Sequence, residues 1–222
     1  MTHEEGSLTL ASNSLTELSF VAQLRMETRA DHDAVDAAFS RFDLGTLEGY
    51  RSFLLAHARV LPAAERLIRP GALITAWQGR SAPLLADIAA LDAVAPEQFS
   101  LELPGGEAGR WGALYVMEGS RLGGTVLAKR VADGLPCAYL SARHPPGAWS
   151  RILQALDQAD GGLEWRRQAV EGAKAMFGAF LAASRAQGLA AEPAGRRRCT
   201  TRAPRSAPLI PPGSSIPPPN AF

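Results

Sequence analysis

Long apolar runs and clustered cysteines are both missing from this chain of 222 residues. No uninterrupted apolar stretch approaches the ~20 residues of a membrane-spanning helix, and no basic region followed by an apolar stretch opens the chain. The two cysteines, Cys137 and Cys199, are far apart and outside any CxxC spacing, which argues against a disulfide framework and a structural zinc site. These absences predict a cytoplasmic protein with no membrane partner.

An excess of charge of either sign is also lacking. Lys and Arg number 23 against 22 Asp and Glu, so the net charge of +1 gives no reason to expect nucleic-acid binding. Five arginines and no acidic residue follow Pro193, which leaves 18 basic against 22 acidic residues before it. Half of the 16 prolines lie in this same segment. We therefore expect a disordered, basic, Pro-rich tail over 191–222 and a flexible, polar N-terminus over 1–15.

Alternating runs of Val, Ile and Thr, which are typical of β-strands, are absent between these ends. Ala and Leu dominate, and apolar residues recur three and four positions apart, as they do in helices. We expect helices over 16–39, 46–68, 81–91, 107–131, 148–158 and 163–187, with a loop over 96–106. The sequence therefore predicts an all-α, single-domain, multi-helix bundle over residues 16–190.

Glycine is frequent where a helix should contain little of it. The segment 107–131 carries Gly112, Gly119, Gly123 and Gly124, and each costs ~1 kcal/mol relative to alanine in a helix interior. Gly119 and Gly123 are four residues apart and share a face, where they leave a shallow trough along the backbone. Two explanations are open: close packing against another helix, or a flat ligand that lies against this one.

A row of basic side chains marks the first expected helix. Arg25, Arg29 and His32 occupy positions i, i+4 and i+7, an arc of roughly 60°. The two arginines repel each other mildly, which is tolerable if an anion lies beside them. A histidine at such a boundary is more often a hydrogen-bonded structural residue than a metal ligand, and the same holds for His57. Opposite a glycine trough, however, the row suits haem, with imidazole on iron and guanidiniums on propionates.

Three segments resemble the biliverdin-producing haem oxygenases. Residues 24–36, LRMETRADHDAVD, resemble the first-helix motif L-[KR]-x-x-T-[KR]-x-x-H of that family. Residues 114–124, LYVMEGSRLGG, resemble its glycine-rich distal helix, and the form E-G-S-x-L-G-G is similar to the bacterial branch associated with phytochromes. Residues 171–177, EGAKAMF, resemble the last family helix more weakly. The resemblance covers roughly residues 15–190 and implies the family's helical fold.

The first motif implies the residues on one side of a bound haem. His32 matches the proximal iron ligand, which makes it the expected metal-binding residue. Arg25 and Arg29 match the basic positions that flank the haem propionates.

The second motif implies the residues on the other side. Gly119 and Gly123 match the glycines whose backbone contacts the distal face and leaves room for oxygen, and Gly124 matches the next glycine of the motif. Ser120 falls where many animal members carry an aspartate that organises distal water. Its hydroxyl can donate and accept a hydrogen bond, but it cannot hold a negative charge. We therefore expect Gly119, Ser120 and Gly123 to form the catalytic side.

The resemblance implies a reaction in which haem is both substrate and cofactor. O2 and reducing equivalents convert it to biliverdin, CO and iron, with an electron donor such as ferredoxin or a reductase. The bacterial form of the motif implies that the biliverdin supplies a bacterial phytochrome. Two alternatives stay open: a haem carrier or sensor of the same fold without turnover, and a haem-free helical interaction protein whose glycines serve packing.

Overall fold

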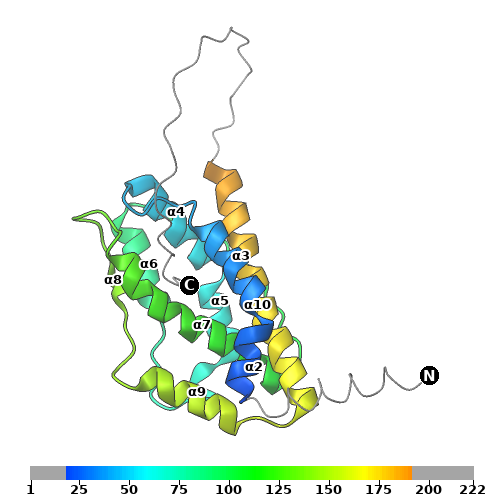
Figure 1. The fold of residues 1–222 in the computed structure, drawn as a ribbon. Helices are drawn as coiled ribbons and strands as arrows, with labels where there is room; N and C mark the ends of the chain where they lie inside the picture. The colour runs from blue at the N-terminus through cyan, green and yellow to red at the C-terminus, as the bar shows by residue number, and fades with distance from the viewer. Residues whose placement is uncertain (1–18, 192–222) are drawn as a thin grey trace, which may run out of the picture.

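Every regular element within the part of the chain that the structure describes, residues 19–191 of a computed structural model, is a helix (Figure 1). In chain order they are α2 (Phe20–Glu27), α3 (Arg29–Phe39), α4 (Leu47–Ala58), α5 (Leu61–Ile68), the 3-10 turn η1 (Pro70–Ala72), α6 (Ser81–Ala90), α7 (Gly106–Ala128), α8 (Ala138–Ser141), α9 (Ala148–Gln158) and α10 (Leu163–Ala191). The all-α prediction is confirmed. The expected flexible N-terminus over 1–15 and the tail over 191–222 lie outside the described residues, except for Ala191 at the end of α10.

Two of the expected helices are each divided in two. The predicted helix over 16–39 breaks at Thr28, whose hydroxyl donates a 2.7 Å hydrogen bond to the Leu24 carbonyl and whose φ of −106° departs from helical values. The predicted helix over 46–68 breaks before α5 because Pro62 lies in the first turn of that helix. The prediction of one continuous helix in each segment was wrong, although the residues on both sides of each break are helical.

The remaining expected helices agree more closely with the structure. α9 has the predicted bounds, α6 ends one residue earlier than expected, and α7 ends at Ala128 rather than at residue 131. The short helix α8 was not predicted from the sequence. Its first turn is capped by the buried Asp87 of α6, whose carboxylate accepts hydrogen bonds from the backbone N–H groups of Ala138 at 3.1 Å and Tyr139 at 2.8 Å.

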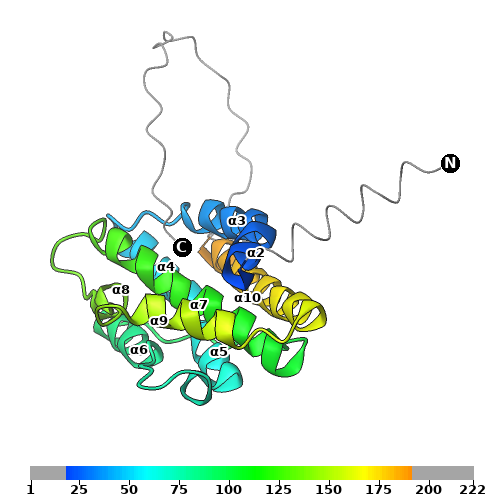
Figure 2. The ribbon, with the colours of Figure 1, turned by 60° about the horizontal axis from the view of Figure 1, so that its bottom comes forward.

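The centre of the bundle is the contact between α7 and α10. In Figure 2, α7 lies between α2 and α3 on one side and α5 and α6 on the other. The two central helices touch through their backbones, since a Cβ atom on Gly112 would lie 1.8 Å from the Ala169 carbonyl oxygen and one on Gly172 would lie 2.2 Å from the Gly109 carbonyl oxygen. Only glycine permits this approach, so packing explains Gly112.

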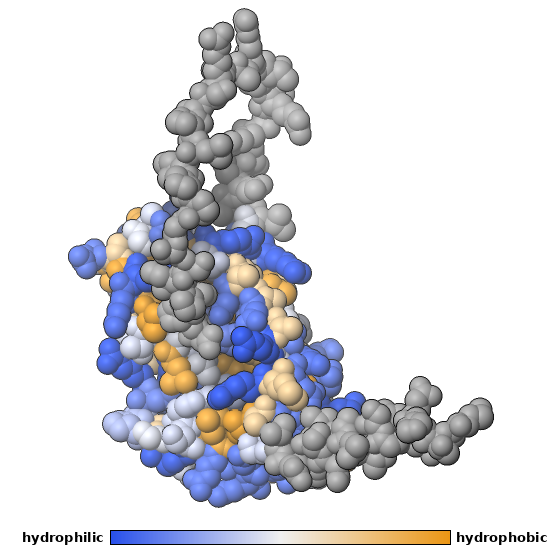
Figure 3. Space-filling model, in the orientation of Figure 1, coloured by the Kyte–Doolittle hydropathy of each residue, from blue (hydrophilic) through white to orange (hydrophobic). Residues whose placement is uncertain are grey.

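Aromatic side chains fill the core where α3, α4, α8 and α10 meet. The rings of Phe39, Phe53, Tyr139 and Phe180 surround His57, with ring centroids between 4.2 and 5.5 Å from that of the imidazole. On the face shown in Figure 3, hydrophilic side chains predominate among the coloured residues and apolar side chains form small separate patches. No described helix is long and apolar enough to cross a membrane.

Candidate functional site

The predicted basic row lies on both sides of the break between α2 and α3. Arg25 is in the last turn of α2, and Arg29 is the first residue of α3. Both side chains are exposed, and Arg29 has its Nε atom 3.8 Å from an oxygen of Asp33 with 81% of its side chain accessible. An exposed pair at this distance contributes little to stability. The two guanidiniums therefore remain accessible to an anion from solvent.

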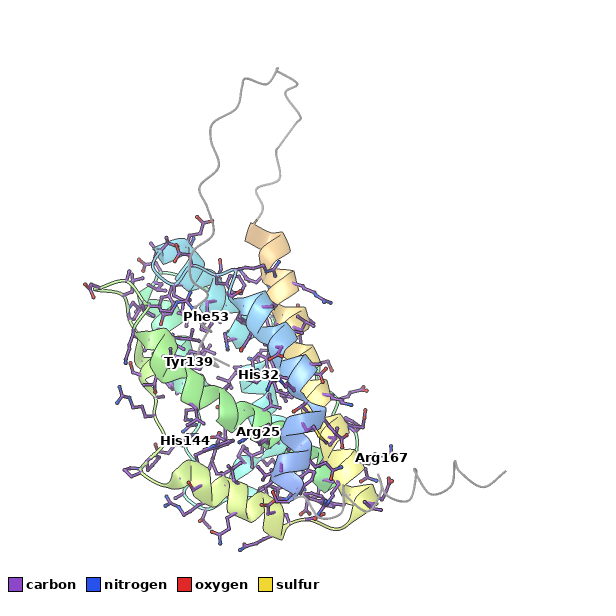
Figure 4. All side chains as sticks on the ribbon, in the orientation of Figure 1. Arg25, His32, Phe53, Tyr139, His144 and Arg167 are labelled. Carbon is purple, nitrogen blue, oxygen red and sulfur yellow. The ribbon has the colours of Figure 1, made fainter. Side chains whose placement is uncertain are left out.

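His32 is the half-buried member of the row. Its Nδ1 atom lies 3.5 Å from a carboxylate oxygen of Asp36 and 3.8 Å from one of Asp33, and 27% of its side chain is exposed. The Phe177 ring of α10 packs edge-on against the imidazole, with 6.0 Å between ring centroids. Figure 4 shows His32 on the side of α3 that faces α7. With carboxylates beside Nδ1, a proton on that atom is favoured, and Nε2 is the ring nitrogen on the side away from them.

The glycines of α7 differ in what surrounds them. A Cβ atom on Gly124 would lie 3.1 Å from the carbonyl oxygen of Leu140, so this glycine allows α8 to approach closely. Gly119 is half-buried, and among the described residues its Cβ would meet only Trp149, at an ordinary contact distance of 3.7 Å. Gly123 is buried, one turn further along on the face of Gly119. Packing accounts for Gly124, whereas it does not require a glycine at position 119.

Ser120 is tied to a buried arginine that the sequence analysis missed. The Ser120 hydroxyl donates to the Met117 carbonyl at 2.7 Å and accepts from Nη2 of Arg80 at 2.8 Å. Arg80 is only 3% exposed and also donates to the Met117 carbonyl. It precedes α6, forty residues before Ser120 in the chain, so no spacing in the sequence connects the two. The structure therefore places a cation directly behind the predicted distal hydroxyl.

His57 is a structural residue, as its type and position suggested. It is 4% exposed, and its Nδ1 atom lies 2.9 Å from the Phe53 carbonyl oxygen, to which it donates because a carbonyl can only accept. Burial lowers the pKa of His57 from 6.5 to about 3, and the nearby Arg80 charge acts in the same direction. The imidazole is therefore neutral at physiological pH.

Comparisons with known proteins agree with each other. No known family model matches the chain. The chain is 41% identical over 80 residues to a curated heme oxygenase from Xanthomonas campestris pv. campestris (strain 8004), a match that spans 33% of this chain and about half (48%) of that protein. Its fold is similar to that of the NO- and CO-bound heme oxygenase from Neisseria meningitidis, with a TM-score of 0.66 and 26% identity over 82% of this chain and 98% of the other.

Proposed function

We propose that the chain belongs to the haem oxygenase family, because it is similar to the Xanthomonas and Neisseria heme oxygenases. We propose on this basis that it binds haem between α3 and α7 and opens the macrocycle with O2 and reducing equivalents. The products are biliverdin, CO and iron. The observation that carries the proposal is His32, a half-buried imidazole beside Asp36 on the side of α3 that faces α7. Haem supplies the redox chemistry when bound, while the protein binds and orients it.

His32 is the proposed protein ligand of the haem iron. Asp36 and Asp33 lie within 3.8 Å of Nδ1 and hold the proton there. A carboxylate in this position orients the ring. The edge-on contact with Phe177 restricts rotation of the ring further. These contacts direct Nε2 of His32 away from the two carboxylates, as iron ligation requires.

The opposite face of the proposed site is the backbone of α7. Gly119 and Gly123 add no side chain of their own to that face, which lets the haem and a diatomic ligand lie close to it, and Gly124 continues the motif beside α8. The Neisseria protein was solved with NO and CO bound, and we infer that this chain likewise admits a diatomic ligand here. The Ser120 hydroxyl, held by Arg80, is the proposed group that holds or passes a proton on this side.

The anionic groups of haem are the proposed partners of Arg25 and Arg29. Both guanidiniums are exposed and lie on consecutive turns, so each can meet a propionate without first losing a buried partner. An electron donor such as ferredoxin or a reductase supplies the electrons. The E-G-S-x-L-G-G form of the α7 motif is our reason to propose that the biliverdin supplies a bacterial phytochrome.

Reconstitution of the full chain with haem tests the proposal. We expect a histidine-ligated haem spectrum that His32→Ala abolishes and that His3→Ala, the control for loss of a histidine, leaves unchanged. An unaltered spectrum in His32→Ala would exclude this residue as the ligand.

A turnover assay on the same reconstituted protein distinguishes an enzyme from a haem carrier. With a reductant in air, we expect a verdin spectrum and released CO. A stable oxygen complex would instead establish the second candidate, a haem carrier or sensor. Ser120 supports this candidate because a serine hydroxyl, unlike an aspartate, cannot carry a negative charge. Failure to bind haem at micromolar concentrations would favour a haem-free interaction protein.

A further inference from the structure

A cavity borders α7 outside the residues proposed to contact haem. It has a volume of about 470 Å3, and it is bounded by the segment 73–78 that follows η1, by α7, by His144 and Pro145, and by α9. None of the residues predicted to contact haem lines it. Figure 4 shows His144 between α7 and α9. A cavity of this size is typical of small-molecule sites.

Polar side chains form one wall of this cavity. Glu118 and Arg121 of α7 are 1% and 4% exposed at their side chains, and Arg121 Nε lies 3.4 Å from a Glu118 carboxylate oxygen. The indole N–H of Trp77 donates to the other oxygen of Glu118 at 2.8 Å. His144 Nε2 donates to the Glu118 backbone carbonyl at 3.0 Å. These contacts fix the wall in one arrangement before any ligand binds.

Arg121 is incompletely satisfied within this wall. Its Nη2 atom donates to the Gln78 carbonyl at 2.6 Å, but its buried Nε atom donates no hydrogen bond to any group in residues 19–191. Burial lowers the pKa of Arg121, and Glu118 offsets this only in part. A buried guanidinium N–H without an acceptor is costly, and an anionic ligand in the cavity would supply one.

The charges around the cavity also favour an anion. Burial lowers the pKa of His144, while the Glu118 carboxylate, 3.6 Å from its Nδ1 atom, acts in the opposite direction. The carboxylate of Glu118 is opposed by Arg121 and by the exposed Arg151 at the rim, which leaves one net positive charge on the lining. Glu65 and Arg80 lie further from Arg121 and oppose each other in their effect on it.

Apart from Thr75 and Gln78, the rest of the lining is apolar. Ile74, Ile152 and Ala155 face the cavity together with the aromatic ring of Trp77. The backbone of Ala76, on the same wall, has a φ of 56°, a left-handed conformation that a non-glycine residue rarely adopts. An apolar body would pack against these groups while its charged end meets the arginines.

We propose that this cavity is a binding site for a small amphipathic carboxylate, with the carboxylate on Arg121 and Arg151 and the apolar body against Trp77 and Ile152. The site is separate from the proposed haem cleft, and the proposal does not depend on haem turnover.

The probes for the test are 2-naphthoate, the neutral 2-naphthol and the cationic 2-naphthylmethylamine, titrated into the full chain with and without bound haem. We expect 2-naphthoate to bind about tenfold or more tightly than the amine, because a buried charge-assisted hydrogen bond favours it by at least that factor. The indole N–H resonance of Trp77, assigned with Trp77→Phe, should shift on binding. Haem should leave the affinity unchanged.

Three variants complete the experiment. Arg151→Gln should weaken 2-naphthoate about threefold, as expected for an exposed charge, while Arg167→Gln, an exposed arginine on α10, should have no effect. Ala155→Phe fills the cavity and should abolish binding while the haem spectrum persists. Equal binding of all three probes, displacement of 2-naphthoate by haem, or full binding in Ala155→Phe would each overturn the proposal.

Discussion

The buried imidazole of His57 should make the protein lose stability in mild acid. Its native pKa of about 3 is far below the 6.5 of an exposed histidine. Between these values the unfolded chain binds a proton that the native protein does not, so the free energy of unfolding falls as the pH is lowered. The contribution of the neutral His57 is complete above pH 6.5, is lost as the pH falls through that value, and stops changing near pH 3.

The size of the effect follows from the linkage relation. Each pH unit in this window costs about 1 kcal/mol of stability for one proton. Two units below 6.5, at pH 4.5, the protein should have lost roughly 2–3 kcal/mol to this residue alone, a large part of the 5–15 kcal/mol that is typical of a folded domain.

Urea unfolding of the haem-free protein at several pH values between 6.5 and 4.5 measures this loss, with His57→Phe as the comparison. Phenylalanine keeps an aromatic ring among Phe39, Phe53 and Phe180 but cannot take up a proton. We expect the variant to be about 1 kcal/mol less stable at pH 6.5, because the hydrogen bond to the Phe53 carbonyl is lost, and to have a flatter pH dependence.

Other groups also respond to acid. Burial lowers the pKa of His144, and hydrogen bonding to Arg166 lowers that of Asp160. His144 and Asp160 are present in the unchanged protein and in His57→Phe. Only the difference between the two proteins' slopes of unfolding free energy against pH therefore reports on His57. Parallel slopes would refute the reasoning, since they would mean that the native protein accepts a proton at His57 without penalty.

Two glycine substitutions on α7 should have opposite effects. In Gly119→Ala the new Cβ would meet, among the described residues, only Trp149 at 3.7 Å. The change should raise the free energy of unfolding of the haem-free protein by up to ~1 kcal/mol while weakening haem binding about tenfold or more. Gly178→Ala, on an exposed face of α10, should give the same gain without loss of haem affinity in a haem titration. Gly112→Ala would place Cβ 1.8 Å from the carbonyl oxygen of Ala169 and should destabilise the protein by roughly 3 kcal/mol or more, read as a lower midpoint in urea; an unchanged midpoint would contradict the close approach of α7 to α10.

The positions of most helices could be predicted from the sequence because helical periodicity is local. The break before α5 had a local signal, because Pro62 cannot continue the helix that ends at Ala58. The apolar pattern is helical on both sides of the break, which led to the prediction of one continuous helix. The break at Thr28 had no comparable signal. A threonine hydroxyl can bond the carbonyl four residues earlier inside a regular helix as well, so the packing of α2 and α3 decides where the helix ends.

The residues behind the site could not be predicted, because they come from distant parts of the chain. Arg80 reaches Ser120 from the position before α6, and His144 reaches Glu118 from the segment before α9. In the sequence, Arg80 follows a glycine and nothing distinguishes it from an arginine in a solvent-exposed loop. Spacing arguments find neighbours on one helix, whereas these contacts exist only after the helices have packed.

Packing explains two of the α7 glycines, and the ligand explanation stays a proposal for Gly119. Gly112, Gly119 and Gly124 each cost ~1 kcal/mol of helix stability, although only Gly119 lies one helical turn from Gly123 on the same face. The cost is offset at Gly112 by the close approach of α10 and at Gly124 by that of α8, because a Cβ atom would meet a backbone carbonyl oxygen at either position. At Gly119 no described neighbour requires a bare backbone. A cost that packing does not offset is expected at a functional site, and Gly119 shares its face with Gly123 on the helix toward which His32 points.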